Sequence, residues 1–501
     1  MENAITRSAG RTLLRQGPVR SALIAALMLS VAACATTGTP GGATPASGSK
    51  SDTKAEKPAA LRPGQDPAAS KAFASTYAPL PRADFAIVGT TAYTGTGTRI
   101  ENATLVVRDG KIVSLTEGGA VPEGVARVDG KGKFITPGIV DAHSHLGVYA
   151  SPGVSAHSDG NEATNPVTSE VWAEHSLWPQ DPGFNRAREG GVTTLHILPG
   201  SANLIGGRSV TVKNVPALSV MGMKFPDAPH GLKMACGENP KRVYGGRGRA
   251  PSTRMANVAG YRAAWIDAAD YARKWDAYYA KVEKGEKADA PKRDLRLDTL
   301  AGVLRGEILI QNHCYRADEM LVMLEIAKEF NYKITMFHHG SEAYKLAREL
   351  KAHDACVATW SGWWGFKMES LDGIEENAGI VDAAGACAVI HSDDAVLTQR
   401  LNQEAVAALS AARRAGINIA PAQAIRWITL NPAKAIGIDK VTGSLEAGKN
   451  ADVVIWNADP LSVYARTERV YIDGAVVYDR KDPRYQPKSD FELGQPGQGA
   501  F

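Results

Sequence analysis

Two histidines separated by one residue follow an apolar segment and are the first candidates for chemistry in this chain. Asp141-Ala142-His143-Ser144-His145 comes directly after a predicted strand over Phe134–Val140. Because alternate side chains of a strand point to the same face, His143 and His145 face one side and could hold one cation between two imidazoles. An isolated pair of this kind is weak evidence, so the prediction of a metal site depends on the other residues at the same end of the fold.

Further ligand candidates stand at the ends of later predicted strands. They are three histidines and two aspartates: His313, His338, His339, Asp393 and Asp394. Imidazole and carboxylate groups suit zinc and similar divalent ions. Taken singly, each histidine fits a buried structural role better than a ligand role. Their joint position at several strand ends is what indicates a metal centre.

The segment that carries these residues alternates between predicted strands and helices. Eight strands are expected, over Phe134–Val140, Val192–Leu198, Ser209–Val215, Gly231–Ala235, Glu307–His313, Lys333–His338, Ala355–Trp360 and Cys387–His391. Helices are expected between the later strands, over Ala317–Phe330, Ser341–His353 and Ile374–Ala384. Eight strands is the number that closes a (β/α)₈ barrel, whose site lies at the C-terminal strand ends. Residues 240–304 interrupt the rhythm and are expected to form an insertion on that face, with a helix near Met255–Glu283.

Short strands and hairpin signals occur on both sides of the barrel segment. Asp109-Gly110 and Asp473-Gly474 each separate two β-rich stretches, which is typical of a hairpin. The predicted fold class is therefore α/β, a TIM barrel with a small β-sandwich domain formed by both chain ends. The expected boundaries are 83–134 and 437–485 for the sandwich, 135–436 for the barrel and 486–501 for a C-terminal tail.

On these residues the sequence resembles the metal-dependent amidohydrolase superfamily, especially its imidazolonepropionase- and prolidase-like branch. The resemblance covers roughly residues 83–485 and rests on Gly138-Ile139-Val140-Asp141-Ala142-His143-Ser144-His145, on His313 and Asp393, and on the tail segments Thr429–Lys434 and Gly443–Val454. It implies a barrel with a β-sandwich and a metal-dependent hydrolase. The metal ligands that it implies are His143, His145, His313, His339 and Asp393. His338 is the alternative to His339, and Asp394 is the alternative to Asp393.

The resemblance leaves the number of metal ions open between one and two. Members with two ions bridge them with a carboxylated lysine or a glutamate, and Lys233 and Glu238 are the candidates for that position. Zinc is the expected ion, with manganese and iron as alternatives. Asp393 is expected to accept a proton from a metal-activated water and to pass it to the leaving nitrogen.

The expected reaction is cleavage of a C–N bond in a small amide, a cyclic amide or a dipeptide. Arg242 and Arg316 lie on the active face of the predicted barrel, and one of them is expected to bind a substrate carboxylate. Trp360-Ser361-Gly362-Trp363-Trp364 fits either the wall of an apolar pocket or loop packing. The alternatives for function are a deaminase or lactonase of the same superfamily, and a noncatalytic tethered binding protein.

The basic excess of the chain lies mainly at its start. Among 501 residues, 57 are Lys or Arg and 53 are Asp or Glu, which gives a net charge of +4. Residues 1–33 carry four arginines before an apolar run, as a lipoprotein signal peptide does. Without them the chain is near neutral, so no nucleic-acid partner is expected. Cys34 is expected to carry lipid, which implies a periplasmic protein anchored in the outer membrane.

Two further expectations concern the segment that begins at Cys34 and the four remaining cysteines. Residues 34–82 are rich in small and polar types and are predicted to be a disordered tether. Four further cysteines lie on or near barrel strands, where buried free thiols are common: Cys236, Cys314, Cys356 and Cys387. A disulfide among these four, and a homo-oligomer, are both left open.

Overall fold

A computed structural model describes residues 73–486, which lie within one compact unit. The predicted signal peptide, the lipid attachment at Cys34 and all but the first residue of the predicted C-terminal tail lie outside the described residues. Within the described part of the chain, none of the helices combines the length and the apolar character that crossing a bilayer requires.

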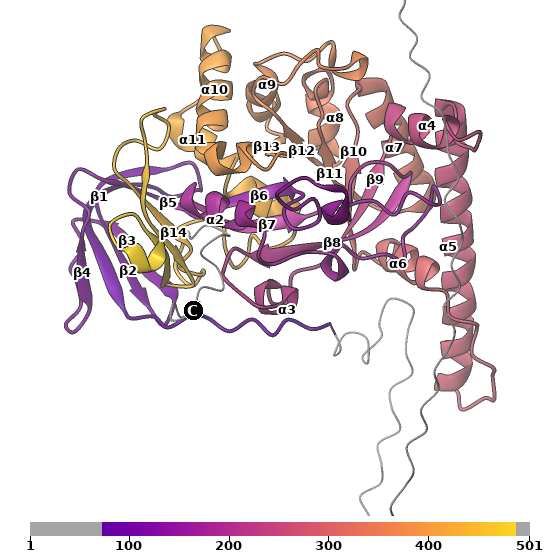
Figure 1. Ribbon diagram of the computed structural model, residues 1–501, viewed down its shortest axis with the longest axis horizontal. Coiled ribbons are helices and arrows are strands. Elements are labelled where there is room, and N and C mark those ends of the chain that lie inside the picture. Colours follow the sequence, from indigo (N-terminus) through magenta and orange to yellow (C-terminus); the bar gives the residue numbers. More distant parts are fainter. Residues whose placement is uncertain (1–72, 487–501) are drawn as a thin grey trace, which may run out of the picture. The chain divides into compact units, whose positions relative to one another are not determined.

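The central layer is an eight-stranded sheet whose spatial order follows the chain order (Figure 1). Its strands are β6 (Ile139–Ser144), β7 (Val192–Ile197), β8 (Ile205–Lys213), β9 (Gly231–Ala235), β10 (Leu309–His313), β11 (Ile334–His338), β12 (Cys356–Thr359) and β13 (Cys387–Ile390). Nearly all of their residues are buried, as expected for strands that are covered on both faces. The arrangement agrees with the predicted barrel.

One strand departs from the regular (β/α)₈ pattern. β8 pairs antiparallel with β7 and with β9, whereas the other ladders of the barrel sheet are parallel. The connection from β7 to β8 is residues 198–204, which is shorter than the crossover of about a dozen residues that parallel strands need. The C-terminal residue of β8, Lys213, therefore lies at the opposite end of the barrel from the C-terminal ends of the neighbouring strands.

The two edge strands of this sheet are joined through the segment between α11 (Pro421–Arg426) and α12 (Leu430–Ala435). The amide of Val140 on β6 donates to the carbonyl of Ile428, and the amide of Ile390 on β13 donates to that of Trp427. The Asp393 amide then donates directly to the His143 carbonyl at 3.0 Å. The seam of the barrel thus fixes the first and last predicted metal-ligand segments against each other.

Both ends of the described chain form a second sheet, which Figure 1 shows as indigo and yellow strands side by side. The strands are β1 (Phe85–Tyr93), β2 (Arg99–Arg108), β3 (Lys111–Glu117), β4 (Ala126–Asp129), β5 (Phe134–Pro137), β14 (Val453–Trp456), β15 (Thr467–Ile472) and β16 (Ala475–Asp479). β5 pairs antiparallel with β14 and so joins the two ends. The division of this sheet into the two layers of a sandwich stays a prediction.

The predicted strand Phe134–Val140 is in fact two strands in two sheets. β5 ends at Pro137 and belongs to the terminal sheet, whereas β6 starts at Ile139 and opens the barrel. Gly138 stands between them, where a Cβ atom would lie only 2.0 Å from the Thr193 hydroxyl oxygen. The continuous apolar pattern concealed this change of sheet, because both strands are buried.

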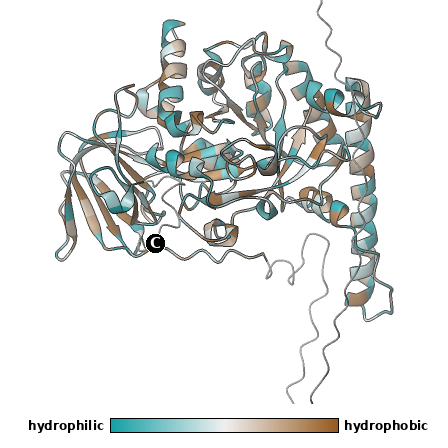
Figure 2. Cartoon of the chain, in the orientation of Figure 1, coloured by the Kyte–Doolittle hydropathy of each residue, from teal (hydrophilic) through white to brown (hydrophobic). Residues whose placement is uncertain are grey.

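Helices surround the barrel sheet, and several of them bury apolar side chains in its core; Figure 2 shows polar and apolar residues along them. They are α2 (Pro182–Glu189), α3 (Val220–Met223), α4 (Glu238–Gly245), α5 (Arg254–Glu283), α6 (Leu295–Leu304), α7 (Ala317–Phe330), α8 (Ala347–Ala352), α9 (Asn377–Ala383) and α10 (Leu401–Arg414). The 30-residue α5 is the main helix of the predicted insertion, and it packs beside α4, α6 and α7. The Thr253 side chain caps it by accepting from the Ala256 amide.

Residues 73–82 differ from the disordered tether predicted for them. The Tyr77 hydroxyl donates to Asp473 at 2.5 Å, and the Ser75 hydroxyl donates to the Lys224 carbonyl at 2.6 Å. Asp473 also accepts from the buried Lys213 ammonium at 2.8 Å. Composition could not reveal this segment as ordered, because its hydrogen-bond partners come from α3, from the residue that follows α3 and from the β15–β16 turn.

Candidate metal centre

The strand ends of the barrel bring together the residues predicted as metal ligands. His143 and His145 come from β6, Lys233 from β9 and His313 from β10. His339 directly follows β11, and Asp393 lies in the loop after β13. His143, His313, His339 and Lys233 are buried, while His145 and Asp393 are partly exposed and face the open side.

Three donor atoms form a nearly equilateral triangle. His143 Nε2 lies 3.2 Å from His145 Nε2 and 3.2 Å from Asp393 Oδ1, and His145 Nε2 lies 3.1 Å from Asp393 Oδ1. Ligands bound at 2.0–2.1 Å in a tetrahedron around one zinc ion are separated by about 3.3 Å. The geometry and the chemistry of these donors therefore fit a single divalent ion.

Lys233 lies beside this triangle, and Glu238 does not. The Lys233 Nζ atom is 3.3 Å from His143 Nε2, and the side chain is fully buried. Burial lowers the pKa of Lys233 to about 8. The Glu238 carboxylate, at the start of α4, instead lies 3.7 Å from the Lys367 ammonium. Of the two residues considered for a bridging position, the structure brings only Lys233 next to the donors.

His339 and His313 extend the donor group on the other side. His339 Nε2 lies 3.9 Å from Asp393 Oδ2, and His339 has a left-handed backbone with φ of 60°. The His313 ring lies 4.7 Å from the His339 ring. His313 Nδ1 is held by the Ser201 hydroxyl at 2.8 Å, while Nε2 is buried without a hydrogen-bond partner in the described part of the chain. A buried nitrogen without a partner is costly unless a ligand satisfies it.

A chain of hydrogen bonds fixes the tautomer of His143. Gln311 Nε2 donates to the Ala435 carbonyl, so its amide oxygen faces His338 Nε2 at 2.9 Å. His338 Nε2 must then carry a hydrogen, which leaves His338 Nδ1 as the acceptor for His143 Nδ1 at 2.8 Å. His143 Nε2 is therefore left with its lone pair directed at the donor triangle.

An equivalent chain acts on His339. His391 Nδ1 faces the Thr359 carbonyl at 3.1 Å and must donate to it. His391 Nε2 then accepts from His339 Nδ1 at 2.8 Å, which leaves the lone pair of His339 on Nε2. His145 Nδ1 likewise donates to the Leu198 carbonyl at 2.8 Å. His338 and His391 are thus positioning residues behind the ligands.

The electrostatics of the centre suit metal binding at neutral pH. Burial, reinforced by the Lys233 charge, holds the pKa of His143 well below its usual value. Burial also lowers the pKa of His313 and of His339. For Asp393, burial raises the pKa, but His339 and His145 outweigh it and hold the pKa well below its usual range. Neutral imidazoles and an ionised carboxylate are the forms in which these residues bind metal.

Asp141 fixes the loop that carries Asp393, which the sequence reasoning missed. The buried Asp141 carboxylate accepts from the hydroxyls of Ser392 at 2.5 Å and Thr398 at 3.0 Å. Burial raises its pKa to about 6, against the effect of these hydrogen bonds. Asp393 itself adopts a left-handed backbone with φ of 56°. The Asp in the Asp-Ala-His-Ser-His motif was the available signal, but nothing local to it indicated a partner about 250 residues away.

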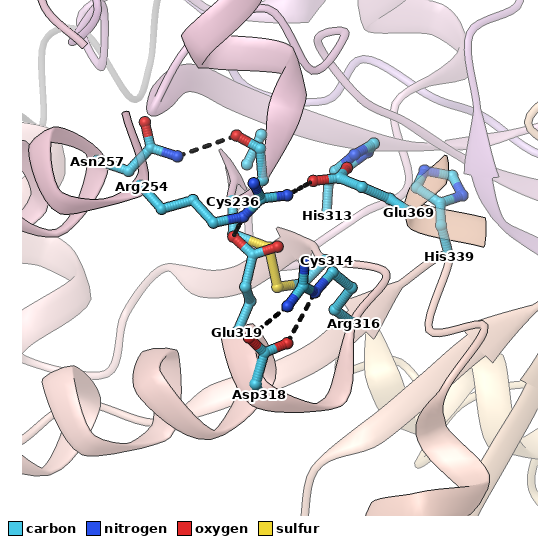
Figure 3. The surroundings of a disulfide bond; sticks show 12 residues. Cys236, Arg254, Asn257, His313, Cys314, Arg316, Asp318, Glu319, His339 and Glu369 are labelled. Carbon is cyan, nitrogen blue, oxygen red and sulfur yellow. Dashed lines mark hydrogen bonds and ion pairs between the residues drawn. A yellow bond between two sulfur atoms is a disulfide. The ribbon is translucent and has the colours of Figure 1, made fainter. Parts of the chain in front are cut away.

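Three other predicted residues lie away from the donors. Asp394 accepts from the backbone amides of Val396 and Leu397, so its carboxylate caps a turn. Arg316 forms two hydrogen bonds to Asp318, as Figure 3 shows, and its side chain is 40% exposed. Arg242 is exposed on α4. Substrate binding by Arg242 or Arg316 stays a prediction.

The four cysteines of the barrel form two disulfides instead of the expected free thiols. Cys236–Cys314 joins the chain just after β9 to the chain just after β10, next to His313 (Figure 3). Cys356–Cys387 joins the first residues of β12 and β13. Their sequence separations are 78 and 31 residues, and only the pairing of neighbouring strands reveals that these cysteines meet.

Comparison with known proteins shows to which family the chain belongs. Residues 367–480 match the model of the amidohydrolase family. The crystal structure of an amidohydrolase from Thermotoga maritima is 34% identical, with a TM-score of 0.72, and the match covers 79% of this chain and all of that chain. The chain belongs to the amidohydrolase family. The superfamily resemblance that the motifs predicted is confirmed.

Two sequence relatives add detail to this assignment. The amidohydrolase tasK of Hapsidospora irregularis is 33% identical over 375 residues, which are 72% of this chain and 38% of that protein. The chain thus spans well under half the length of that relative. An imidazolonepropionase from Fusobacterium nucleatum is 20% identical over 76% of this chain and 92% of its own length. As an amidohydrolase, the chain is an enzyme of the class that acts on C–N bonds.

Proposed function

We propose that this amidohydrolase is a metal-dependent hydrolase that cleaves a C–N bond of a small amide, a cyclic amide or a dipeptide. The triangle of His143 Nε2, His145 Nε2 and Asp393 Oδ1, with edges of 3.1–3.2 Å, is the observation that carries the proposal. The Asp393 oxygen lies at the partly exposed side of the triangle, where a water and a substrate carbonyl can approach.

The residues of the centre have different roles in such a reaction. His143, His145 and Asp393 would hold a divalent ion, which when bound would activate water near neutral pH and polarise the carbonyl. Asp393, ionised and within reach of the same position, accepts the proton of the attacking water and delivers it to the leaving nitrogen. His338 and His391 hold the ligand histidines in the tautomers that keep Nε2 free.

We propose zinc as the ion, because imidazole and carboxylate donors at this spacing suit it. A second ion is proposed on the His313 and Lys233 side of the centre. The neutral Lys233 amine, by adding carbon dioxide and losing a proton, would become a carbamate able to help hold metal there. Its pKa of about 8 supports this step, because a useful fraction of the amine is neutral at pH 7.

The test is a chelation and reconstitution experiment on the purified chain. The protein is freed of metal, reloaded with zinc or manganese, and assayed against dipeptides, N-acyl amino acids, hydantoins, imidazolone-type cyclic amides, aminopurines and lactones. We expect metal-dependent release of an amine or an opened ring from an amide. Turnover of only aminopurines or only lactones would replace the proposal with a deaminase or a lactonase, and no metal-restored turnover would overturn it.

We further propose that the protein is exported and anchored by lipid at Cys34. The arginine-rich apolar start of the chain supports this, and so do the two disulfides, because disulfides persist in oxidising compartments. Cell fractionation of the full chain and of Cys34→Ala tests the proposal. We expect the full chain in the membrane fraction and the variant released from it; a cytosolic full chain would contradict it.

A further inference from the structure

A partly buried ammonium group lies near the candidate metal centre, on the connection between β12 and α9. Lys367 Nζ is 3.9 Å from the centroid of the Tyr315 ring, and the Lys367 side chain is 16% exposed. The Tyr315 ring in turn lies 5.0 Å from the His313 ring and 5.5 Å from the His339 ring, nearly parallel to the latter. One aromatic ring thus separates Lys367 from two ligand candidates.

Two carboxylates lie near the Lys367 ammonium, but both are beyond ordinary hydrogen-bonding distance. Its Nζ lies 3.7 Å from Glu238 Oε1 and 3.9 Å from Glu369 Oε2, both longer than the hydrogen bond of about 2.8 Å that an ammonium forms with a carboxylate. Glu369 is already hydrogen-bonded to Arg254, which also pairs with Glu319 at 3.0 Å (Figure 3). The ammonium therefore keeps hydrogen-bonding capacity for an incoming anion.

A second cation lies near Lys367. Arg242, on α4, adds a second positive charge that acts on Lys367. An anion at Lys367 would lie beside the Tyr315 ring, which neighbours His313 and His339. The two cations would attract it, and the nearby Glu238 and Glu369 carboxylates would oppose it.

A wall of aromatic rings runs from the ligands to the surface at the same place. Trp360 stacks on His339 at 4.7 Å, and Trp363 stacks on Trp360 at 5.2 Å. Phe366 packs edge-on against both tryptophans at 5.8 and 6.1 Å. Trp363 is 42% exposed and Phe366 is 54% exposed. Partly exposed aromatic rings that continue into a catalytic centre are suited to bind an apolar group.

We infer that Lys367 and the aromatic wall of Trp360, Trp363 and Phe366 bind a substrate that carries both a carboxylate and an apolar side chain. The carboxylate lies on the Lys367 ammonium, and the side chain lies on the wall. An N-acyl amino acid or a dipeptide that ends in a hydrophobic residue has this chemistry. The inference rests on the proposed function, because it assigns the scissile carbonyl to the donor triangle.

Two matched compounds test the site through hydrolysis by the zinc-loaded enzyme. N-acetyl-L-phenylalanine has the carboxylate, and N-(2-phenylethyl)acetamide lacks it. We expect the wild type to prefer the first by about tenfold or more in kcat/KM. Lys367→Met should lose this preference through KM, with kcat changed by less than about threefold. Lys367→Arg should keep the preference, because the positive charge remains.

Lys345→Met is the control, because Lys345 also lies over a tyrosine ring, at 5.6 Å, and between two carboxylates, at 2.9 and 3.4 Å. We expect it to behave as the wild type. Equal selectivity in wild type and Lys367→Met, with both proteins folded and zinc-loaded, would overturn the inference. So would a loss of selectivity of the same size in Lys345→Met.

Binding of 3-phenylpropanoate, measured by calorimetry, separates failure of this inference from failure of the proposed function. The compound has the ring and the carboxylate but no scissile amide, and 3-phenylpropan-1-ol is its neutral match. We expect the acid to bind the wild type about tenfold more tightly than Lys367→Met, and the alcohol to bind both alike. Absence of hydrolysis with this binding difference would sink the proposed function alone. Equal binding of the acid to both proteins would sink the carboxylate site.

Discussion

At the residue scale, the metal centre consists of the ligand candidates and of the side chains that hold them in place. Strand alternation places His143 and His145 on one face, and strand ends bring His313 and Asp393 to the same side of a barrel. The roles of His338 and His391 depend on which ring nitrogen meets which neighbour, and no sequence pattern carries that information. Lys367 was missed for a similar reason, since only the folded β12–α9 connection brings it to Tyr315.

The first prediction concerns His338, which accepts from His143 at 2.8 Å. Replacing it with Phe removes that acceptor and frees His143 to take the other tautomer. We expect zinc affinity to fall by about 10- to 100-fold. His338→Asn places an oxygen near the position of Nδ1 and should restore most of the affinity. Competition with a chromophoric chelator measures both values.

His196→Asn is the matched control for this prediction. His196 is also a fully buried histidine, and its ring nitrogens lie 2.9 and 2.8 Å from the hydroxyls of Thr211 and Ser209. We expect its zinc affinity to stay close to that of the wild type. If His338→Phe and His338→Asn bind zinc equally, His338 does not act by fixing the tautomer of His143.

At the element scale, most strands and helices were predicted close to their observed positions. β9 and α7 have the predicted bounds, and α7 is an amphipathic run between the polar residues Arg316 and Asn331. The antiparallel direction of β8 was not predicted, since periodicity marks a strand but not its direction. The largely apolar run Phe134–Val140 predicts one continuous strand, so the change of sheet at Gly138 could not be predicted.

The second prediction compares the two disulfides, which join neighbouring strands. The loops that they close have 78 and 31 residues. Chain entropy then assigns about 4.5 kcal/mol of stability to Cys236–Cys314 and about 3.7 kcal/mol to Cys356–Cys387. We expect both double alanine variants to unfold at a lower temperature than the wild type in calorimetry. The variant without Cys236–Cys314 should have the lowest unfolding temperature.

Zinc binding distinguishes the two disulfides further. Cys314 directly follows His313, so the Cys236→Ala, Cys314→Ala variant should bind zinc more weakly. Cys356 and Cys387 lie at the other ends of their strands, so the Cys356→Ala, Cys387→Ala variant should bind zinc as the wild type does. Equal zinc affinity in both double variants would contradict a role for the first disulfide in holding His313.

At the scale of the whole molecule, the pairing of both chain ends could be predicted, because strand and hairpin signals recur at each end of a barrel pattern. The order in residues 73–82 could not, because it depends on the buried Lys213 and Asp473 pair. Burial of many histidines in one barrel has a consequence for the stability of the entire protein. Those histidines carry a proton in the unfolded chain below pH 6.5, but they resist protonation in the fold.

The third prediction is therefore a loss of stability of the metal-free protein in acid. Burial lowers the pKa of His391 to about 4. This histidine therefore leaves the free energy of unfolding unchanged above about pH 6.5 and lowers it increasingly as the pH decreases toward 4. At pH 5 this one histidine costs about 2 kcal/mol. Asp141, whose pKa is raised to about 6, offsets about 1.4 kcal/mol at the same pH.

Six further histidines act in the same direction as His391, because burial lowers the pKa of each: His143, His196, His230, His313, His338 and His339. The depressed pKa of Asp393 has no effect in this window, since that carboxylate is ionised in both states above its unfolded pKa of about 3.9. Urea unfolding at pH 8, 6.5 and 5 measures the net effect. A stability at pH 5 that equals that at pH 8 would contradict it.

We propose that His143, His145 and Asp393 hold the ion on which hydrolysis depends. A titration of the metal-free enzyme with zinc, in which bound zinc and the rate of amide hydrolysis are followed together, tests this directly. We expect hydrolysis to return in proportion to one or two bound zinc ions per chain, and we expect His145→Asn to bind less zinc and to stay inactive. A folded wild type that binds no zinc, or that hydrolyses its amide equally well without metal, would show that these residues do not hold such an ion.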